Sequence, residues 1–183
     1  EQFRRLVEHA NAHDVPVSFD VNFRSALWSV DDARTLLRWV VQRSRLVFCS
    51  LRDGAVLFGA GRIDDERRPL SEHAEALARA IVAEGPNTAV VSIGDDGVVA
   101  LHDGEIVSAS SEHAEVVDRV GAGDALAAGV IDGWLDGDVA AGVRRGSHLA
   151  ALALAQRGDM VHLAPADLTE TRAPSSAESG IVR

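Results

Sequence analysis

The chain has 183 residues, enough for one domain with a sizeable core, and its 46% hydrophobic and 25% charged content is typical of globular proteins. Its formal net charge of −10 argues against nucleic acid or an anionic membrane as a partner, because both are polyanions. No apolar run is long enough to span a bilayer, and the first residues lack the apolar core of a signal peptide. The lone Cys49 cannot form an intrachain disulfide, so we expect a buried thiol in a cytoplasmic protein.

Apolar spacing and β-branched runs predict an alternation of helices and strands along most of the chain. The predicted helices are 2–13, a segment that starts at 31 and has apolar positions at 36, 37, 40 and 41, a short one through 56–58, and then 75–84, 124–135 and 138–156. The predicted strands are 16–20, 46–49, 89–93, 98–102 and 105–108. Asp103-Gly104, between the last two strands, is a strong signal for a two-residue hairpin.

This order of elements predicts an α/β fold with a mostly parallel sheet covered on both faces. Ligands of such sheets bind at the carboxyl ends of the strands. The chain begins with a helix that feeds a strand, so we expect the sheet to lack its first strands. We further expect one domain over residues 1–168, followed by a polar, disordered tail over 169–183.

The segment from Asp118 to Asp124 reads Asp-Arg-Val-Gly-Ala-Gly-Asp and opens a predicted helix. Gly121 and Gly123 allow a tight bend with exposed amides, and amides at a helix N-terminus form an anion site. Asp124 falls in the first turn, where a carboxylate can take a proton from a hydroxyl that attacks phosphorus. Taken alone, these residues also fit a glycine turn in which Asp124 caps the helix. They match neither a Walker loop nor a full dinucleotide fingerprint.

Together with the small-residue helix from Ala125 to Gly133, this segment resembles the signature of the ribokinase-like carbohydrate kinases, the PfkB family. The resemblance implies a three-layer α/β/α fold, represented here by its C-terminal part without the N-terminal strands and the lid. It also implies that ATP is the phosphate donor and that Asp124 is the catalytic base, in contact with the sugar. The amides of Gly121, Ala122 and Gly123 would form an anion hole for the transferred phosphoryl group.

Two further segments resemble the nucleotide site of the family. Ser-Ile-Gly-Asp-Asp-Gly at 92–97 looks like its strand-to-turn segment, and the alanine-rich stretch 151–159, before Pro165, looks like its last helix beside the adenine pocket. The residues thereby implied in nucleotide binding are Ser92, Gly94, Gly97, Gly121, Gly123, His148 and Ala151. An ordinary glycine turn, and a core helix with a structural histidine, are the alternatives.

Asp20-Val21-Asn22-Phe23-Arg24 ends a predicted strand and offers a carboxylate, an amide and a guanidinium at a ligand-facing edge. The segment resembles 2-keto-3-deoxygluconate kinases and related fructokinases within the family. This implies that Asp20, Asn22 and Arg24 bind substrate, with Arg24 on the carboxylate of a sugar acid, a group that arginine binds in bidentate fashion. A surface ion pair between Arg24 and a nearby acid is the alternative.

Ser50-Leu51-Arg52-Asp53 falls where the family usually carries Asn-x-x-Glu, which helps to organise magnesium and phosphate, often through water. Serine replaces asparagine and the shorter aspartate replaces glutamate. The resemblance implies a role for Asp53 near Mg²⁺, through water. A plain cap at a helix start is the alternative.

The matches span Pro16 to about Pro165, and three functions follow. The first is an ATP-dependent sugar kinase whose substrate is a 2-keto-3-deoxy sugar acid such as 2-keto-3-deoxygluconate. The second is a truncated, non-catalytic nucleotide-binding module of the same fold. The third is an unrelated oxidoreductase, which lacks the fingerprint spacing. Small molecules are the expected partners, and homo-oligomerisation stays open.

Overall fold

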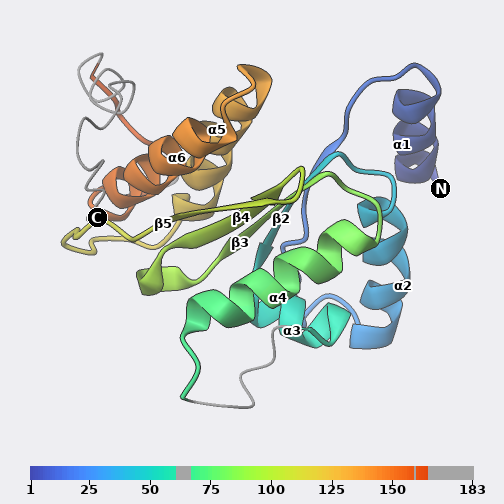
Figure 1. Ribbon diagram of the computed structural model, residues 1–183, viewed down its shortest axis with the longest axis horizontal. Coiled ribbons are helices and arrows are strands. Elements are labelled where there is room, and N and C mark those ends of the chain that lie inside the picture. Colours follow the sequence, from blue (N-terminus) through green and yellow to red (C-terminus); the bar gives the residue numbers. More distant parts are fainter. Residues whose placement is uncertain (61–66, 159, 165–183) are drawn as a thin grey trace, which may run out of the picture. The chain divides into compact units, whose positions relative to one another are not determined.

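The computed structural model describes residues 1–60, 67–158 and 160–164 (Figure 1). The chain divides into two compact units, Glu1–His113 and Ala114–Arg183. The tail expected to be disordered, Asp159 and Pro165 lie outside the described residues. The single domain expected over residues 1–168 stays a prediction.

The first unit carries a sheet and the helices that precede or follow its strands. Its helices are α1 (Gln2–Ala12), α2 (Val30–Val41), α3 (Leu51–Phe58) and α4 (Leu70–Ala83), with a short 3₁₀ helix at Gly94–Asp96. Its strands are β1 (Ser18–Asp20), β2 (Leu46–Ser50), β3 (Thr88–Ser92), β4 (Val98–His102) and β5 (Glu105–Ala109). Every predicted strand is therefore present.

The sheet is mixed, with the strand order β1-β2-β3-β4-β5. β1, β2 and β3 run parallel to one another, whereas β4 and β5 add two antiparallel pairings. The predicted α/β class is confirmed, and the parallel arrangement holds for β1 to β3. Asp103 and Gly104 form the predicted two-residue turn between β4 and β5, with φ values of +46° and +91°. Positive φ at both central positions is what a turn matched to strand twist requires.

Serine side chains fix the starts of two helices. Ser29 accepts a hydrogen bond from the amide of Asp32 at the start of α2, and Ser50 accepts one from the amide of Asp53 at the start of α3. Such caps satisfy backbone donors that the helix leaves without partners. Asp31 and Asp32 lie in the first turn of α2, as predicted. Ser50 therefore ends β2 and starts α3 without an intervening loop.

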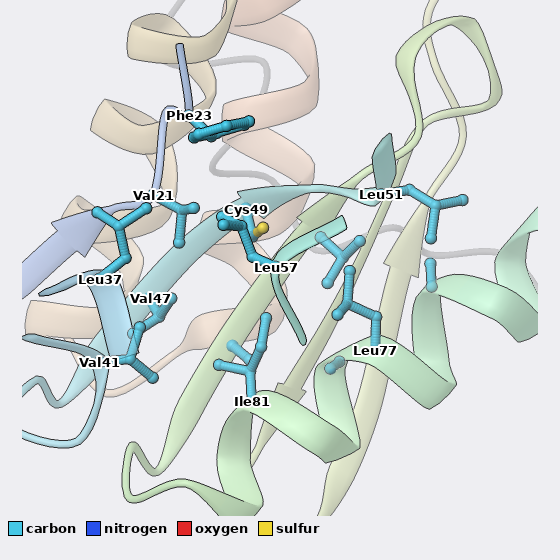
Figure 2. Close-up of a cluster of buried hydrophobic side chains, with 14 of the residues drawn as sticks. Val21, Phe23, Leu37, Val41, Val47, Cys49, Leu51, Leu57, Leu77 and Ile81 are labelled. Atoms are coloured by element: carbon cyan, nitrogen blue, oxygen red, sulfur yellow. The ribbon is translucent and has the colours of Figure 1, made fainter. Parts of the chain in front are cut away.

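The core of the first unit lies between the sheet and the helices α2, α3 and α4 (Figure 2). Val47 and Cys49 of β2 lie on the face that Leu77 and Ile81 of α4 approach. Phe48, on the opposite face of β2, is buried as well. Burial on both faces explains why the strands read as continuous apolar runs rather than as an alternation.

The second unit is built on two helices, α5 (Ala122–Leu135) and α6 (Val139–Leu154), in close backbone contact. A Cβ on Gly129 or Gly133 of α5 would lie 2.4 Å from backbone atoms of Gly146 or Gly142 of α6, respectively. The small residues that characterise this part of the sequence therefore serve the packing of the two helices.

Candidate functional site

The carboxyl ends of the parallel strands carry the predicted site residues of the first unit. Asp20 is the last residue of β1, Ser50 of β2 and Ser92 of β3. Ser50 and Ser92 are register partners, and Asp20 is paired with Phe48, two residues before the end of β2. The strand register thus brings the segments that start at Asp20, Ser50 and Ser92 to one edge of the sheet, the usual ligand-binding edge.

Alternating burial turns Asn22 and Arg24 outward. Val21 and Phe23 are buried in the core, whereas Asn22 and Arg24 are exposed. The Asp20 carboxylate accepts a hydrogen bond from the Asn22 amide at 3.1 Å and supports the left-handed backbone of that residue, whose φ is +36°. Asp20 therefore shapes the turn that presents Arg24.

The guanidinium of Arg24 forms no ion pair with any residue that the structure describes. The alternative of a surface ion pair is therefore not observed within the described ranges. An exposed guanidinium without a carboxylate partner is able to bind an anionic ligand in bidentate fashion.

Asp53 lies buried in the first turn of α3, with 8% of its surface exposed. Its carboxylate accepts a hydrogen bond from Nε of Arg52 at 3.0 Å, and Ser50 provides the side-chain cap of the helix. Ser50, and not Asp53, makes the side-chain cap bond, while Asp53 lies in the first turn, where the helix dipole favours a negative charge. Burial is the largest cause of the raised pKa of the Cys49 thiol, and the charges of Asp53 and Asp20 raise this pKa further. Cys49 is thus the expected buried thiol.

The donor set at Asp53 fits a magnesium ion only if the ion is held chiefly by other ligands. Among residues 1–60, 67–158 and 160–164 there is no group of three His, Cys, Asp or Glu side chains that could hold a metal. Mg²⁺ on nucleotides commonly keeps several waters and takes one or two protein carboxylates along with phosphate oxygens. A single carboxylate such as that of Asp53 is compatible with this mode.

The turn after β3 is shaped by Gly94 and Gly97. Gly94 has φ +64° and lies in open space, where a side chain would meet nothing within 4 Å. Gly97 has φ +105°, and a Cβ there would lie 2.2 Å from the carbonyl oxygen of Ala109. Because Gly97 has no side chain, the end of β5 is able to lie close to the backbone of Gly97. Nucleotide contact at Ser92, Gly94 and Gly97 stays a prediction.

The predicted anion site is a helix start in the second unit. Gly121 is the N-cap of α5 and has a left-handed backbone, with φ +83°. The amide of Ala125 is bonded to the carbonyl of Gly121 at 2.9 Å, so the amides of Ala122, Gly123 and Asp124 precede the first hydrogen bond of the helix. Amides in this position, with the helix dipole behind them, attract anions.

The carboxylate of Asp124 is exposed at this helix start. It makes no cap hydrogen bond, and within the described part of the chain it has neither a hydrogen-bond nor an ion-pair partner. The next residue, Ala125, is buried against Leu149 and Ala153 of α6, which fixes the helix and turns Asp124 outward. The alternative of Asp124 as a capping residue is therefore not observed.

Asp118 has a role in the structure that its place in the motif does not indicate. Its carboxylate accepts hydrogen bonds from the amide of Val120 and from the amide of Gly158, both at 3.1 Å. These bonds, first that of Gly158 and then that of Val120, lower the pKa of Asp118. An aspartate two residues before Val120 is a recognisable local turn signal. The partner at Gly158, 40 residues away, has no such signal.

His148 and Ala151, the other residues predicted to bind the nucleotide, lie in the second half of α6 and differ in exposure. His148 is half-buried, and Ala151 is buried with 8% of its surface exposed. Ala153 packs with Ala125 and Leu149 in the core of the second unit, so part of this alanine-rich helix serves packing. Contacts of His148 and Ala151 with adenine stay a prediction.

Comparison with known proteins decides the family. The profile of the pfkB family carbohydrate kinases matches residues 2–166 of this chain. The chain belongs to the pfkB family of carbohydrate kinases. This confirms the family resemblance carried by the segment from Asp118 to Asp124.

Relatives within the pfkB family include kinases named for dehydro-deoxy sugar acids. The chain is 28% identical over 181 residues to the 2-dehydro-3-deoxygalactonokinase of Haloferax volcanii, covering 97% of this chain and 53% of that protein. It is 30% identical over 151 residues to the 2-dehydro-3-deoxygluconokinase of Bacillus subtilis, covering 79% of this chain and 42% of that protein. The chain therefore spans about half the length of the curated relatives it matches.

The fold is shared with solved pfkB-type kinases. The crystal structure of the 2-dehydro-3-deoxygluconokinase of Thermotoga maritima aligns with a TM-score of 0.79 at 22% identity, covering 92% of this chain and 53% of that one. At this identity the likeness concerns the fold alone. Within the described residues, no helix combines the length and the apolar character needed to cross a membrane.

Proposed function

We propose that the protein carrying this chain is an ATP-dependent kinase that phosphorylates a sugar hydroxyl, with Asp124 as the catalytic base. Membership of the pfkB family supports a carbohydrate kinase. The observation that carries the residue assignment is the carboxylate of Asp124 in the first turn of α5, which is exposed and has no partner among the residues that the structure describes. That carboxylate has lone pairs available for a proton, and it stands beside amides suited to an anion.

In the proposed chemistry the carboxylate of Asp124 and the backbone amides before it have separate roles. Asp124 takes the proton from the attacking sugar hydroxyl as the bond to the γ-phosphorus forms, and ADP leaves. The amides of Gly121, Ala122 and Gly123 stabilise the charge on the transferred phosphoryl group. Phosphoryl transfer depends mainly on such positioning and electrostatic stabilisation, so exposed amides at a rigid helix start suit it.

Magnesium is proposed to bind together with the nucleotide. When bound, the ion would neutralise charge on the phosphate oxygens. Asp53 is the carboxylate of this chain proposed to act near it, through water. The remaining proposed nucleotide contacts are those of Ser92, Gly94, Gly97, His148 and Ala151.

The proposed substrate is a 2-keto-3-deoxy sugar acid. Arg24 supports this choice because its guanidinium is exposed and has no ion-pair partner among the described residues. The Asx-type turn at Asp20 and Asn22 presents Arg24 at the carboxyl edge of the sheet. The names of the relatives from Haloferax volcanii and Bacillus subtilis support the same substrate class.

The experiment compares two aspartate-to-asparagine changes at helix starts of the second unit. Asp124→Asn removes the proposed base, and we expect kcat to fall by roughly 100-fold or more with 2-keto-3-deoxygluconate and ATP. Asp138→Asn is the matched control, because Asp138 caps α6 by accepting from the amide of Ala141 and asparagine caps equally well. Wild-type turnover in Asp124→Asn would refute the base assignment.

The second candidate is a non-catalytic nucleotide-binding module of the same fold. The pairing of Asp53 with Arg52 favours it, because this ion pair competes for the carboxylate proposed to act near magnesium. Calorimetry with a non-hydrolysable ATP analogue separates the two functions. Nucleotide binding without phosphorylated sugar would favour the module, whereas binding together with turnover supports the kinase.

A further inference from the structure

The loop that leads into α5 is tied to the end of α6 by hydrogen bonds that run in both directions. The amides of Val117 and Asp118 donate to the carbonyl of Leu154, the last residue of α6, at 2.8 Å and 3.2 Å. In return, the amide of Gly158 donates to Oδ2 of Asp118 at 3.1 Å. A carbonyl at a helix C-terminus has no partner within its helix, so the first pair of bonds also completes α6.

The second oxygen of Asp118 acts on the loop itself. Oδ1 accepts from the amide of Val120 at 3.1 Å, directly before the left-handed residue Gly121. One carboxylate therefore joins the residue before the glycine bend to the turn after α6. Hydrogen bonds from Gly158 and Val120, with the charge of Arg157 as a lesser contribution, lower the pKa of Asp118. The group thus stays ionised at neutral pH and accepts through both oxygens.

We propose that Asp118 is a positioning residue for the nucleotide phosphates, because its two-sided clamp holds the Gly121 bend and the amides that follow it. The inference rests on the proposed kinase function. A helix start binds phosphate well only if its amides are held in place before the ligand arrives. Asp118 does not itself touch the nucleotide in this account. It acts through the backbone of residues 119–121.

Asparagine at position 118 tests the clamp with almost no change in shape. One carboxylate oxygen becomes an NH₂ group, which faces an amide donor instead of accepting from it. Either the bond from Val120 or that from Gly158 is lost, while the bonds from the amides of residues 117 and 118 to Leu154 are untouched. We therefore expect Asp118→Asn to fold with α5 and α6 still packed.

The expected result concerns nucleotide affinity and not sugar affinity. In the full protein carrying this chain, Asp118→Asn should bind a non-hydrolysable ATP analogue about tenfold more weakly by calorimetry, since a hydrogen bond to a charged group is lost. Sugar affinity should be unchanged, and the amide of Val120 or of Gly158 should exchange faster with deuterium. Calorimetry reports the affinity of the folded molecules, so a purely structural role would lower the stoichiometry and leave the affinity alone. Asp138→Asn is the same-change control.

A second variant covers the case in which asparagine prevents folding. In Asp118→Ser the hydroxyl is able to accept from Val120 in the same local turn but does not extend to Gly158. In this variant the amide of Val120 should remain protected from deuterium exchange, and the amide of Gly158 should exchange faster. Nucleotide binding should be weaker than in the wild type. Wild-type nucleotide affinity in the folded variant would overturn the clamp. The proposed function fails separately, if the wild-type protein neither binds the nucleotide nor consumes it.

Discussion

Gly129 of α5 lies so close to Gly146 of α6 that a methyl group on Gly129 would lie 2.4 Å from the backbone nitrogen of Gly146. The atoms in the way belong to a helix backbone, which cannot rotate aside as a side chain can. We expect Gly129→Ala to lower the free energy of unfolding by about 1–3 kcal/mol through overpacking, even though alanine is the better helix former. Urea denaturation followed by circular dichroism measures the change.

Gly123 provides the control for this substitution. It lies in the same helix, but a Cβ there would meet no atom within 4 Å. Gly123→Ala should therefore be as stable as the wild type or slightly more stable. Equal stability of the Gly129→Ala and Gly123→Ala proteins would mean that the two helices are packed less closely than the structure shows.

The buried guanidinium of Arg145 should contribute to stability far more than that of its neighbour. Arg145 is 6% exposed and forms an ion pair with Asp132 of α5, whereas Arg144 is exposed and has no partner among the described residues. Arg145→Ala removes both the ion pair and the packing of the side-chain stem, so we expect a loss of about 2–4 kcal/mol. Arg144→Ala should change stability by less than about 0.5 kcal/mol. Parallel denaturation curves of the two variants decide the matter.

Glu84 should make the stability of the first unit sensitive to acid. Burial of Glu84 opposes its ionisation, but hydrogen bonds from Arg38 and Gln42, with the charge of Arg38, lower its pKa below the ordinary 4.5. The unfolded chain therefore takes up this proton at a higher pH than the folded chain does, and stability is lost as pH falls through the folded-state pKa. The contribution is fully present above about pH 5.5, beyond the unfolded pKa.

The variant Glu84→Gln tests this dependence. Glutamine cannot be protonated, so the free energy of unfolding should fall less steeply between about pH 5 and pH 3 than in the wild type. Urea midpoints measured at several pH values give the two slopes. An unchanged slope would assign the acid sensitivity to other carboxylates, such as that of Asp118, whose pKa is also lowered.

Arg24 should determine the preference for an acidic sugar. In Arg24→Ala we expect kcat/KM for 2-keto-3-deoxygluconate to fall by about 10-fold to 100-fold, as for the loss of a charged hydrogen bond, with little change for a neutral sugar. Stability should not change, since the side chain is exposed and has no ion-pair partner among the described residues. Arg5→Ala, at an exposed pair with Glu1 on α1, serves as the control. Equal losses for acidic and neutral sugars would contradict a carboxylate contact.

The sequence predicts those parts of the fold that are specified by residues adjacent in the chain. The strand Val98–His102 and the turn at Asp103-Gly104 are predicted with their observed bounds, because a short apolar run and turn residues are local signals. The start of α3 was predicted several residues late. The Ser50-to-Asp53 pattern had been interpreted as a metal-site motif, whereas it also encodes the hydrogen-bonded cap that starts the helix at Leu51.

The rest of the site depended on contacts between distant residues. Nucleotide contact at Gly97 stays a prediction, and nothing in the sequence indicates that its missing side chain also makes room for the backbone of Ala109. The bond between Asp118 and Gly158 joins positions 40 residues apart, and no spacing rule indicates it. The exposure of Asp124 depends in turn on the packing of Ala125 against Leu149. Motifs predicted the chemistry, and tertiary packing determined which of the predicted side chains are exposed.

The thiol of Cys49 has a practical consequence for spectroscopy. It is the only cysteine in the chain, it is buried in the core of the first unit, and its raised pKa leaves almost no thiolate to react at neutral pH. A cysteine introduced at an exposed position, such as Glu105 on β5 or Arg144 on α6, would therefore take a maleimide dye selectively in the otherwise native chain. Pairs of such dyes would report by energy transfer how nucleotide binding changes the distance between chosen positions.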